Sequence, residues 1–262
     1  MDNSAGYVLV TGASRGLGRC FARTLASSGR DLILVARSAD KLASLAAELK
    51  RQHGVKVEYF VLDLAERAAG QRLADQILDR NLDVDLLINN AGFGDQGKFL
   101  ELELERQLDA INLQTVAVVE LTYRLLPPMI ERSAGGIINI SSMAGFQPIP
   151  YATVYSAAKA FLTTFSLALE AEVEPFGIAV VTVCPGLMAV ADEDVDEQAK
   201  PKKFPGGAQQ HDEIVTAALR TLRRGGGLVI PGGVNKFAAF AERFVPRGQI
   251  AKLVKKMSTL PS

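Results

Sequence analysis

The chain has 262 residues, 48% of them hydrophobic and 22% charged, so it is long enough and apolar enough to bury a full core. Its 29 basic and 29 acidic residues balance, which argues against nucleic acid as a partner. There is no transmembrane-length apolar run and no signal-peptide pattern in the first six residues, and two distant cysteines with two histidines exclude a Cys/His metal cluster. We therefore expect a cytoplasmic protein with free thiols and no metal.

The first predicted strand covers residues 7–10, and a glycine-rich turn over residues 11–18 follows it. A helical apolar pattern starts at Leu17 and ends at Gly29. Backbone N–H groups at a helix N-terminus favour an anion, and glycines let the chain approach it closely. The turn therefore predicts a cradle for a dinucleotide diphosphate, with a purely structural turn as the alternative. The cradle residues would be Gly12, Ser14, Arg15, Gly16, Leu17 and Gly18.

The second predicted strand, residues 31–36, ends at Ala36 and is followed by Arg37. In dinucleotide folds an acidic residue here binds the 2′-hydroxyl of NAD, whereas an arginine accommodates the 2′-phosphate of NADP. Because no acid is present, the sequence predicts that NADP(H) is preferred over NAD(H). Arg15 could supply a second cation, and the alternative is that Arg37 is an ordinary solvated side chain.

Two further strands, over residues 57–61 and 86–88, end in polar segments. Asp63, with Leu64 beside it, would bind the adenine amino group, or Asp63 would cap the next helix. Residues 89–92 would pack against the cofactor or form a structural asparagine network. The positions expected at the cofactor are Asn90, Ala91 and Gly92.

The rest of the chain continues the alternation of strands and helices. Further strands are predicted over residues 137–142, 179–184 and 228–230. Helices are predicted over residues 40–52, 65–80, 101–131 with a break near Asn112, 151–174 and 212–223. Pro127 and Pro128 should kink or end the third of these helices. The pattern predicts a single α/β domain, residues 1–262, with a doubly wound, seven-stranded parallel sheet and helices on both faces, a Rossmann fold.

Tyr155 and Lys159 lie one turn apart on the predicted 151–174 helix and therefore share a face. An ammonium beside a phenol favours the phenolate, so Lys159 is expected to lower the pKa of Tyr155 from its usual value of about 10. Tyr155 would then be a proton donor to a carbonyl near neutral pH. The spacing alone is a weak signal, because chance produces it readily in a chain with five tyrosines.

Two segments near the end of the chain have distinct compositions. Residues 187–210 combine acidic and lysine clusters with little periodicity, which predicts a substrate loop or a surface loop without a role. Residues 234–262 are predicted as an amphipathic helical tail with an apolar stripe of Phe237, Phe240 and Phe244. The tail would pack against its own protein, cover the pocket, join subunits or touch a membrane surface.

Taken together, the motifs resemble those of the short-chain dehydrogenase/reductase family over roughly residues 5–190. They occur in the family's order and at similar spacing. They are Thr11-Gly12, Gly16, Gly18, Asp63, the Asn-Asn-Ala-Gly segment at 89–92, Asn112, Ser142, Tyr155 with Lys159, and Pro185-Gly186.

This resemblance implies a catalytic tetrad. Ser142 would hold and polarise the substrate carbonyl, and Tyr155 would donate the proton. Lys159 would bind the nicotinamide ribose and lower the pKa of Tyr155, and Asn112 would hold a water that links Lys159 to solvent. Ser141, the neighbour of Ser142, would point to the opposite face of the strand. The nicotinamide would carry the hydride.

The implied activity is NADPH-dependent reduction of a ketone or aldehyde, or oxidation of the corresponding secondary alcohol. The alternative is a catalytically silent NADP-binding sensor or scaffold. At position 190 this chain has a valine, where the family often has a threonine. The resemblance also implies a homodimer or homotetramer, with the helices over residues 112–131 and 151–174 at the subunit interface. Further cofactor contacts are expected from Pro185 and Gly186. Substrate contacts are expected from Ser142, Phe93, Phe146, Tyr151 and Leu187.

Overall fold

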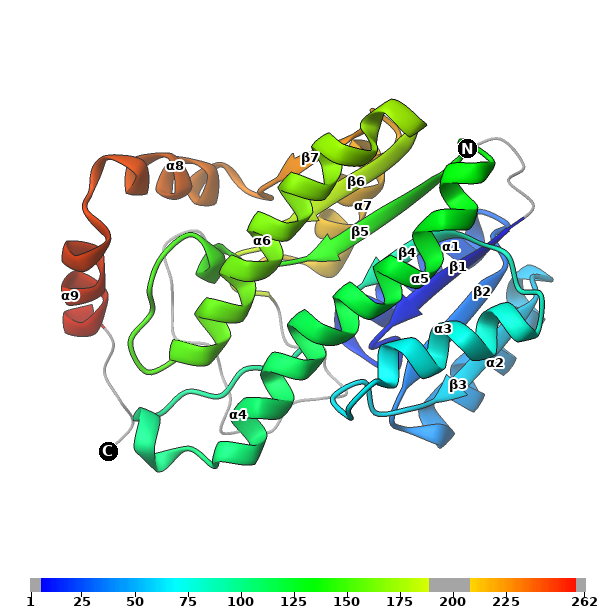
Figure 1. Ribbon diagram of the computed structural model, residues 1–262, viewed down its shortest axis with the longest axis horizontal. Coiled ribbons are helices and arrows are strands. Elements are labelled where there is room, and N and C mark those ends of the chain that lie inside the picture. The colour runs from blue at the N-terminus through cyan, green and yellow to red at the C-terminus, as the bar shows by residue number, and fades with distance from the viewer. Residues whose placement is uncertain (1–5, 189–207, 258–262) are drawn as a thin grey trace.

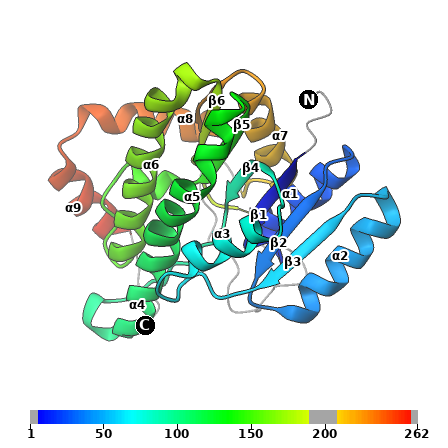
Figure 2. The same ribbon diagram turned by 45° about the vertical axis from the view of Figure 1, so that its right-hand side comes forward.

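The computed structural model describes residues 6–188 and 208–257 (Figure 1). Most of the predicted substrate loop, Val190 included, and the last residues of the tail lie outside this part of the chain. Two helical layers enclose one twisted sheet, and helices α8 and α9 extend to one side (Figures 1 and 2).

The sheet has seven parallel strands in the order β3-β2-β1-β4-β5-β6-β7, which confirms the predicted fold class. Its register pairs Val10 of β1 with Leu34 of β2 and with Ile88 of β4. Strand order reverses between β1 and β4, so the loops that follow these strands diverge and leave a crevice at their carboxyl ends. The strands are β1 Tyr7–Thr11, β2 Leu32–Ala36, β3 Val57–Val61, β4 Val84–Asn89, β5 Gly135–Ile140, β6 Ile178–Val183 and β7 Gly226–Val229.

Each face of the sheet forms its own hydrophobic core, because the strands are apolar on both sides. One core packs against α1 Gly16–Ser27, α2 Ala39–His53 and α7 His211–Leu222. The other packs against α3 Ala69–Asp79, α5 Ala117–Glu131 and α6 Thr153–Val173. The remaining helical elements are η1 Phe99–Glu101, α4 Leu104–Ile111, η2 Asn112–Val116, η3 Met143–Gly145, η4 Glu174–Phe176, α8 Gly233–Ala241, η7 Glu242–Phe244 and α9 Arg247–Met257.

Two predicted helices differ from the structure. The helix expected from residue 65 begins at Ala69, because turns precede it and Ala68 has a left-handed φ of 56°. Helix α5 does not end at Pro127 and Pro128 but continues to Glu131. Both prolines lie near its C-terminus, where the helix lacks only their two N–H donors and continues past them. The predicted break near Asn112 is confirmed as a π-helical turn, η2.

Both cysteines are free thiols, as predicted, with Cys184 buried and Cys20 half-buried. Among the helices that the structure describes, none is long and apolar enough to cross a membrane. Within the same residues, no group of three His, Cys, Asp or Glu side chains is placed to hold a metal ion.

Candidate functional site

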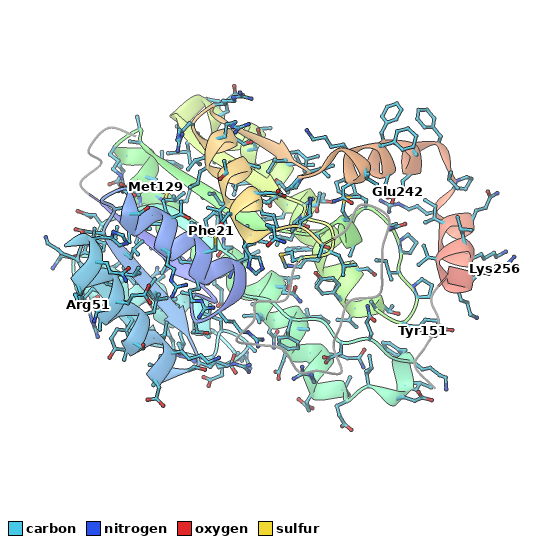
Figure 3. All side chains as sticks on the ribbon, turned by 180° about the vertical axis from the view of Figure 1, so that it is seen from behind. Phe21, Arg51, Met129, Tyr151, Glu242 and Lys256 are labelled. Atoms are coloured by element: carbon cyan, nitrogen blue, oxygen red, sulfur yellow. The ribbon has the colours of Figure 1, made fainter. Side chains whose placement is uncertain are left out.

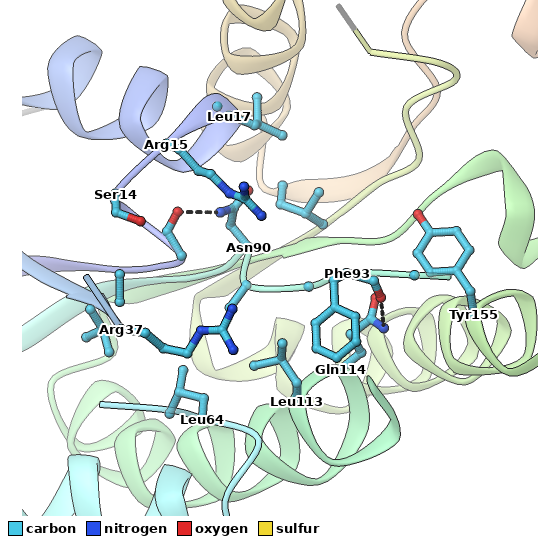
Figure 4. A pocket seen from close by; sticks show the side chains of 18 of the residues that line it. Ser14, Arg15, Leu17, Arg37, Leu64, Asn90, Phe93, Leu113, Gln114 and Tyr155 are labelled. Atoms are coloured by element: carbon cyan, nitrogen blue, oxygen red, sulfur yellow. Dashed lines mark hydrogen bonds between the residues drawn. The ribbon is translucent and has the colours of Figure 1, made fainter. Parts of the chain in front are cut away.

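A cavity of about 690 Å³ lies at the carboxyl ends of β1, β2, β4 and β5, where the strand order reverses (Figure 4). Arg15 and Arg37 lie toward one end of it, and Tyr155 lies at the other. The cavity gathers most of the residues predicted for the cofactor. Those that line it are Gly12, Ser14, Arg15, Gly16, Leu17, Arg37, Asp63, Leu64, Asn90, Ala91, Gly92, Tyr155 and Lys159.

The floor of the cavity is formed by the turn after β1 and the segment after β4. The Thr11 hydroxyl accepts the backbone N–H groups of Asn90 at 2.9 Å and Ala91 at 3.0 Å, and the Asn90 amide donates to the Thr11 carbonyl at 2.9 Å. Gly12 has a φ of 66°, and a Cβ there would lie 2.9 Å from the Ala91 Cα. Only glycine therefore fits at this position.

The glycines of the turn have different tasks. Gly16 opens α1 with a φ of 50°, and the nearest atom to a Cβ there would be His211 Cε1 at 3.9 Å, so the space above this helix N-terminus is open. Gly18 faces the opposite way and packs against Gly12. It does not line the cavity, so its part in cofactor binding is to let α1 approach β1.

The asparagines after β4 also divide into two roles. Asn89 is buried, and its amide donates to the Asn139 side chain at 2.8 Å, which in turn donates to Ser166 at 2.8 Å. Asn89 thus belongs to a structural network, whereas Asn90 faces the cavity. Of the two alternatives for this segment, the structural asparagine network applies to Asn89, and a position at the cofactor cavity applies to Asn90.

The end of the cavity beside β2 is exposed and predominantly basic. Arg37 keeps 66% of its side chain exposed, and its Nη1 lies 3.3 Å from Asp63 Oδ2. The other oxygen of Asp63 accepts the backbone N–H of Ala65 at 3.0 Å, so Asp63 closes the turn after β3. Arg15 and Lys41 add two more cations to this lining, so among the described side chains beside β2 the basic groups outnumber the carboxylate of Asp63.

The opposite end is buried. Lys159 is 4% exposed, and its ammonium donates to the Ile140 carbonyl at 2.8 Å and lies 5.7 Å from the centre of the Tyr155 ring. The Ser141 hydroxyl donates to the Lys159 carbonyl at 2.9 Å and is 2.7 Å from the Thr163 hydroxyl, so it is held by α6, although Ser141 is also one of the residues that line the cavity. The carboxyl end of β5 is thereby held against α6.

Burial sets the proton affinities at this end. Desolvation raises the pKa of Tyr155 above its usual value of about 10, and a hydrogen bond with Ser142 acts in the opposite direction. Desolvation also lowers the pKa of Lys159 to about 8, partly offset by the Cys184 thiol. The expectation that Lys159 lowers the pKa of Tyr155 is therefore wrong for this structure. Its ammonium is turned toward the Ile140 carbonyl instead of the phenol.

Ser142 and Asn112, the remaining predicted tetrad residues, lie next to the cavity without lining it. Ser142 follows β5, and its hydroxyl accepts the N–H of Ala144 at 3.1 Å. It lies close enough to Tyr155 to act on the pKa of the phenol. Asn112 opens the π-helical turn η2, which packs against α6, the helix of Tyr155 and Lys159.

The predicted substrate contacts are only partly brought together. Phe93 lines the cavity, whereas Phe146, Tyr151 and Leu187 do not. The Tyr151 carbonyl accepts the N–H of Gly97 at 2.8 Å in the loop beside the cavity. Pro185 and Gly186 also lie off the lining, and the Gly186 N–H is bound by the Gln209 side chain at 2.8 Å.

Several cavity residues were missed by sequence reasoning. Ser38 and Lys41 follow Arg37 within about one helical turn, a spacing that could have identified them. Gln114 is 1% exposed and binds the Phe93 carbonyl at 2.8 Å, while its own oxygen has no hydrogen-bond partner (Figure 4). His211 reaches the cavity from α7, and no local pattern links it to Gly16.

These features fit a dinucleotide with an additional phosphate. The open N-terminus of α1 suits a diphosphate, because free backbone N–H groups and the helix dipole favour an anion there. The cations beside β2 suit a second anionic group. The half-buried phenol and the buried ammonium at the far end suit a reaction that needs a proton.

The chain is similar to known dehydrogenases and reductases. A family model described as short chain dehydrogenase matches residues 6–200. The very-long-chain 3-oxoacyl-CoA reductase of Anas platyrhynchos is 36% identical over 226 residues, which cover 82% of this chain and 68% of that protein. Ketoacyl reductase HetN of Nostoc sp. is 36% identical over 216 residues, which cover 82% of this chain and 75% of that protein.

A solved structure of a short-chain dehydrogenase from Sphingobium yanoikuyae in complex with NADPH is 31% identical, with a TM-score of 0.78 over 98% of both chains. The matches to two of the very-long-chain reductases span 68% and 64% of their lengths.

Proposed function

The chain belongs to the short-chain dehydrogenase/reductase family, and we propose from this premise that it reduces a 3-oxoacyl thioester to the 3-hydroxyacyl thioester with NADPH. It is an oxidoreductase that acts on C=O and CH–OH groups. The observation that carries the proposal is the half-buried Tyr155 beside the buried Lys159, at one end of a cavity whose other end is basic. The names of the similar curated proteins support a 3-oxoacyl substrate.

The cavity residues divide along the length of the cofactor that they would hold. Arg15, Arg37 and Lys41, with the Ser38 hydroxyl, would bind the 2′-phosphate of the adenosine ribose. The turn from Gly12 to Leu17 would bind the diphosphate. The segment 90–92 and Lys159 would hold the nicotinamide ribose. The nicotinamide, when bound, supplies the hydride.

Tyr155 would complete the reduction by donating its phenolic proton to the carbonyl oxygen, so that hydride and proton together convert C=O to CH–OH. A phenol has an ordinary pKa of about 10, so Tyr155 holds its proton at neutral pH and has one to donate. Ser142, which lies beside the same phenol, would donate to the carbonyl oxygen as negative charge develops on it. Asn112 would position a water that returns a proton by way of Lys159.

A preference for NADPH over NADH is part of the proposal. Neither Ala36 nor Arg37 provides the carboxylate that would bind a 2′-hydroxyl and repel a 2′-phosphate. The nearest carboxylate, Asp63, is held by Arg37 and the backbone N–H of Ala65. Complexes of similar solved proteins with NADPH support this preference.

We further propose a homo-oligomer in the cytoplasm. The surface formed by η2, α5 and α6 exposes large apolar side chains, and such a patch is typical of a subunit contact. The two free thiols fit a reducing compartment. Light scattering coupled to size-exclusion chromatography tests the oligomer. The exposed side chains are Val116, Val119, Tyr123, Phe161 and Leu167.

The test of the proposed function is the loss of NADPH absorbance with 3-oxoacyl-CoA substrates of short and long chain, beside simple ketones and aldehydes. We expect turnover of the 3-oxoacyl thioesters and a lower kcat/KM for ketones without the thioester. A protein that binds NADPH by calorimetry yet turns over none of these compounds would contradict the proposed function and favour a silent NADP-binding protein.

A further inference from the structure

The last helices of the described chain leave an apolar surface without a partner. Helix α8, the short η7 and helix α9 extend beyond the body on the side of α6 (Figures 1 and 2). Phe237, Phe240 and Phe244 keep 72%, 57% and 73% of their surface exposed. We call these three side chains the aromatic face.

The aromatic face is a continuous feature and not a set of scattered residues. Spacings of three and four residues place the three side chains on one side of the α8–η7 helix. The rings of Phe240 and Phe244 contact each other edge to face, with centroids 5.2 Å apart. Val234 and Val245, 54% and 40% exposed, extend the apolar surface at either end. Contiguous exposed apolar surface of this kind marks an interaction site.

The charged residues of the segment that carries the aromatic face are nearly all basic, although the chain as a whole is neutral. Within residues 233–257 the only acidic residue is Glu242, which is half-buried, and burial raises its pKa. One of its carboxylate oxygens is buried without a hydrogen-bond partner. Figure 3 shows Lys256 on the outer side of α9, pointing away from the body. The exposed cations of this segment are Lys236, Arg247, Lys252, Lys255 and Lys256.

We propose that the α8–α9 segment docks on an anionic membrane surface, with the aromatic face in the headgroup region and the lysines on lipid phosphates and carboxylates. A helix with aromatic side chains on one side and lysines or arginines beside them is suited to the plane of a bilayer interface. The absence of exposed carboxylates from the described part of residues 233–257 complements the negative charge of such a surface. A protein partner of mixed charge would have no comparable match.

The position of α8 connects this surface to the cavity. Asn235, in the first turn of α8, lies against Gly186, so that a Cβ at Gly186 would fall within 3.0 Å of its side chain. Two residues further on, Met188 lines the cavity. Docking would therefore bring the bilayer near the cavity. The use of this arrangement for long acyl chains rests on the proposed function, but the docking itself does not.

The experiment is co-sedimentation of the purified full-length protein with vesicles of phosphatidylcholine alone or mixed with phosphatidylserine. We expect sedimentation with the mixed vesicles, little with the neutral ones, and release at high salt. The triple variant Phe237→Ser/Phe240→Ser/Phe244→Ser should lose at least about tenfold in partitioning. The double variant Lys255→Glu/Lys256→Glu should lose roughly 25-fold, because each lysine near such a surface contributes about fivefold.

Each variant has a matched control elsewhere on the surface. Phe176→Ser makes the same change at a phenylalanine that is 47% exposed in η4, and Lys50→Glu/Arg51→Glu reverses two exposed cations at the end of α2. Both controls should sediment like the wild type. All variants should keep their NADPH affinity, which shows that they are folded, and this readout does not depend on any substrate.

Two results would overturn the proposal. One is a wild-type protein that sediments with neither type of vesicle, or a triple variant that sediments as strongly as its control Phe176→Ser. The other is a wild type that does not bind vesicles, together with a triple variant whose oligomeric state, measured by light scattering, differs from that of the wild type. That result would assign the aromatic face to a second copy of the chain.

Discussion

The two ends of the cavity differ in how far their charged groups are exposed to water. At the adenosine end the charges are exposed, with Arg37 66% accessible and an ion pair of 3.3 Å to Asp63. At the reacting end Lys159 is 4% exposed and the pKa of its ammonium is lowered to about 8. The first end keeps ordinary charges that water screens, whereas the second holds groups whose proton affinity burial has changed.

This difference separates binding from chemistry. An exposed cation can select a phosphorylated cofactor with little effect on stability, because an exposed ion pair contributes less than about 1 kcal/mol. A buried ammonium carries a desolvation penalty that the fold must offset, here with the Ile140 carbonyl as partner. We therefore expect substitutions at the two ends to affect different measurements.

The largest expected effect is on the rate, at the buried end. Tyr155→Phe removes the phenolic proton and keeps the ring, so the reductase kcat should fall by a factor of about 10² to 10⁴. NADPH affinity by calorimetry should change little, because the hydroxyl is one contact among many. A variant that retains most of its activity would show that another group donates the proton. Tyr151→Phe, off the cavity lining, is the matched control.

The next effect is a pH-dependent stability at Lys159. The unfolded amine has a pKa of 10.5 and the folded one about 8, so between these values the unfolded state binds more protons. The free energy of unfolding should therefore rise with pH through this window, and fall as pH drops toward 8. The full rise is on the order of 3 kcal/mol.

Lys159→Met removes this group while keeping a chain of similar length. The variant should lose the rise in unfolding free energy between pH 8 and 10.5, in urea titrations at several pH values. It should also lose reductase activity, and it should keep its stability at neutral pH, because the buried charge is gone. Lys50→Met on the surface of α2 is the control. Identical pH slopes for wild type and Lys159→Met would refute the assignment.

At the exposed end, Arg37→Ala should weaken NADPH binding by about tenfold to a hundredfold, because a charge-assisted hydrogen bond to a phosphate contributes about 1.5–3 kcal/mol. NADH affinity should stay nearly constant, since NADH lacks the 2′-phosphate. Urea unfolding should shift by less than about 1 kcal/mol. An equal loss for both cofactors would mean that Arg37 acts through Asp63 on the shape of the cavity.

Sequence reasoning succeeded where a short stretch contains its own explanation. The strands are apolar runs and the Gly12–Gly18 turn joins a strand to a helix, so period, length and turn chemistry are readable in a few residues. Tyr155 and Lys159 could be paired because both lie on one helix. The catalytic roles remain predictions, although the structure does bring Ser142 close to Tyr155.

Sequence reasoning failed for properties that depend on packing between segments far apart in the chain. The pKa of Tyr155 follows from burial and from where Lys159 points, and the Ile140 carbonyl that attracts this ammonium lies on another element. Gln114 and His211 reach the cavity through the folding of η2 and α7 against it. No spacing in the sequence links them to the glycine turn.

The smallest expected effect concerns His211, whose exposure is intermediate between the exposed and the buried end of the cavity. His211 is half-buried at the start of α7, over the open N-terminus of α1 at Gly16. Burial and the Arg19 charge lower its pKa below the ordinary value of about 6.5, against the opposing pull of Asp212, so the ring is neutral at pH 7. Acidification would place a positive charge beside the diphosphate and tighten cofactor binding.

We expect this tightening to be about twofold to fivefold, the size of a partly screened charge interaction. NADH is the better probe, because the 2′-phosphate of NADPH titrates near pH 6 itself. Calorimetry at about pH 5.5 and pH 7.5 should show the gain in the wild type and not in His211→Asn. Arg37→Ala should keep it, because NADH has no 2′-phosphate for Arg37 to bind. If His211→Asn retained the gain, the imidazole would lie too far from the diphosphate, and the cradle would be complete without α7.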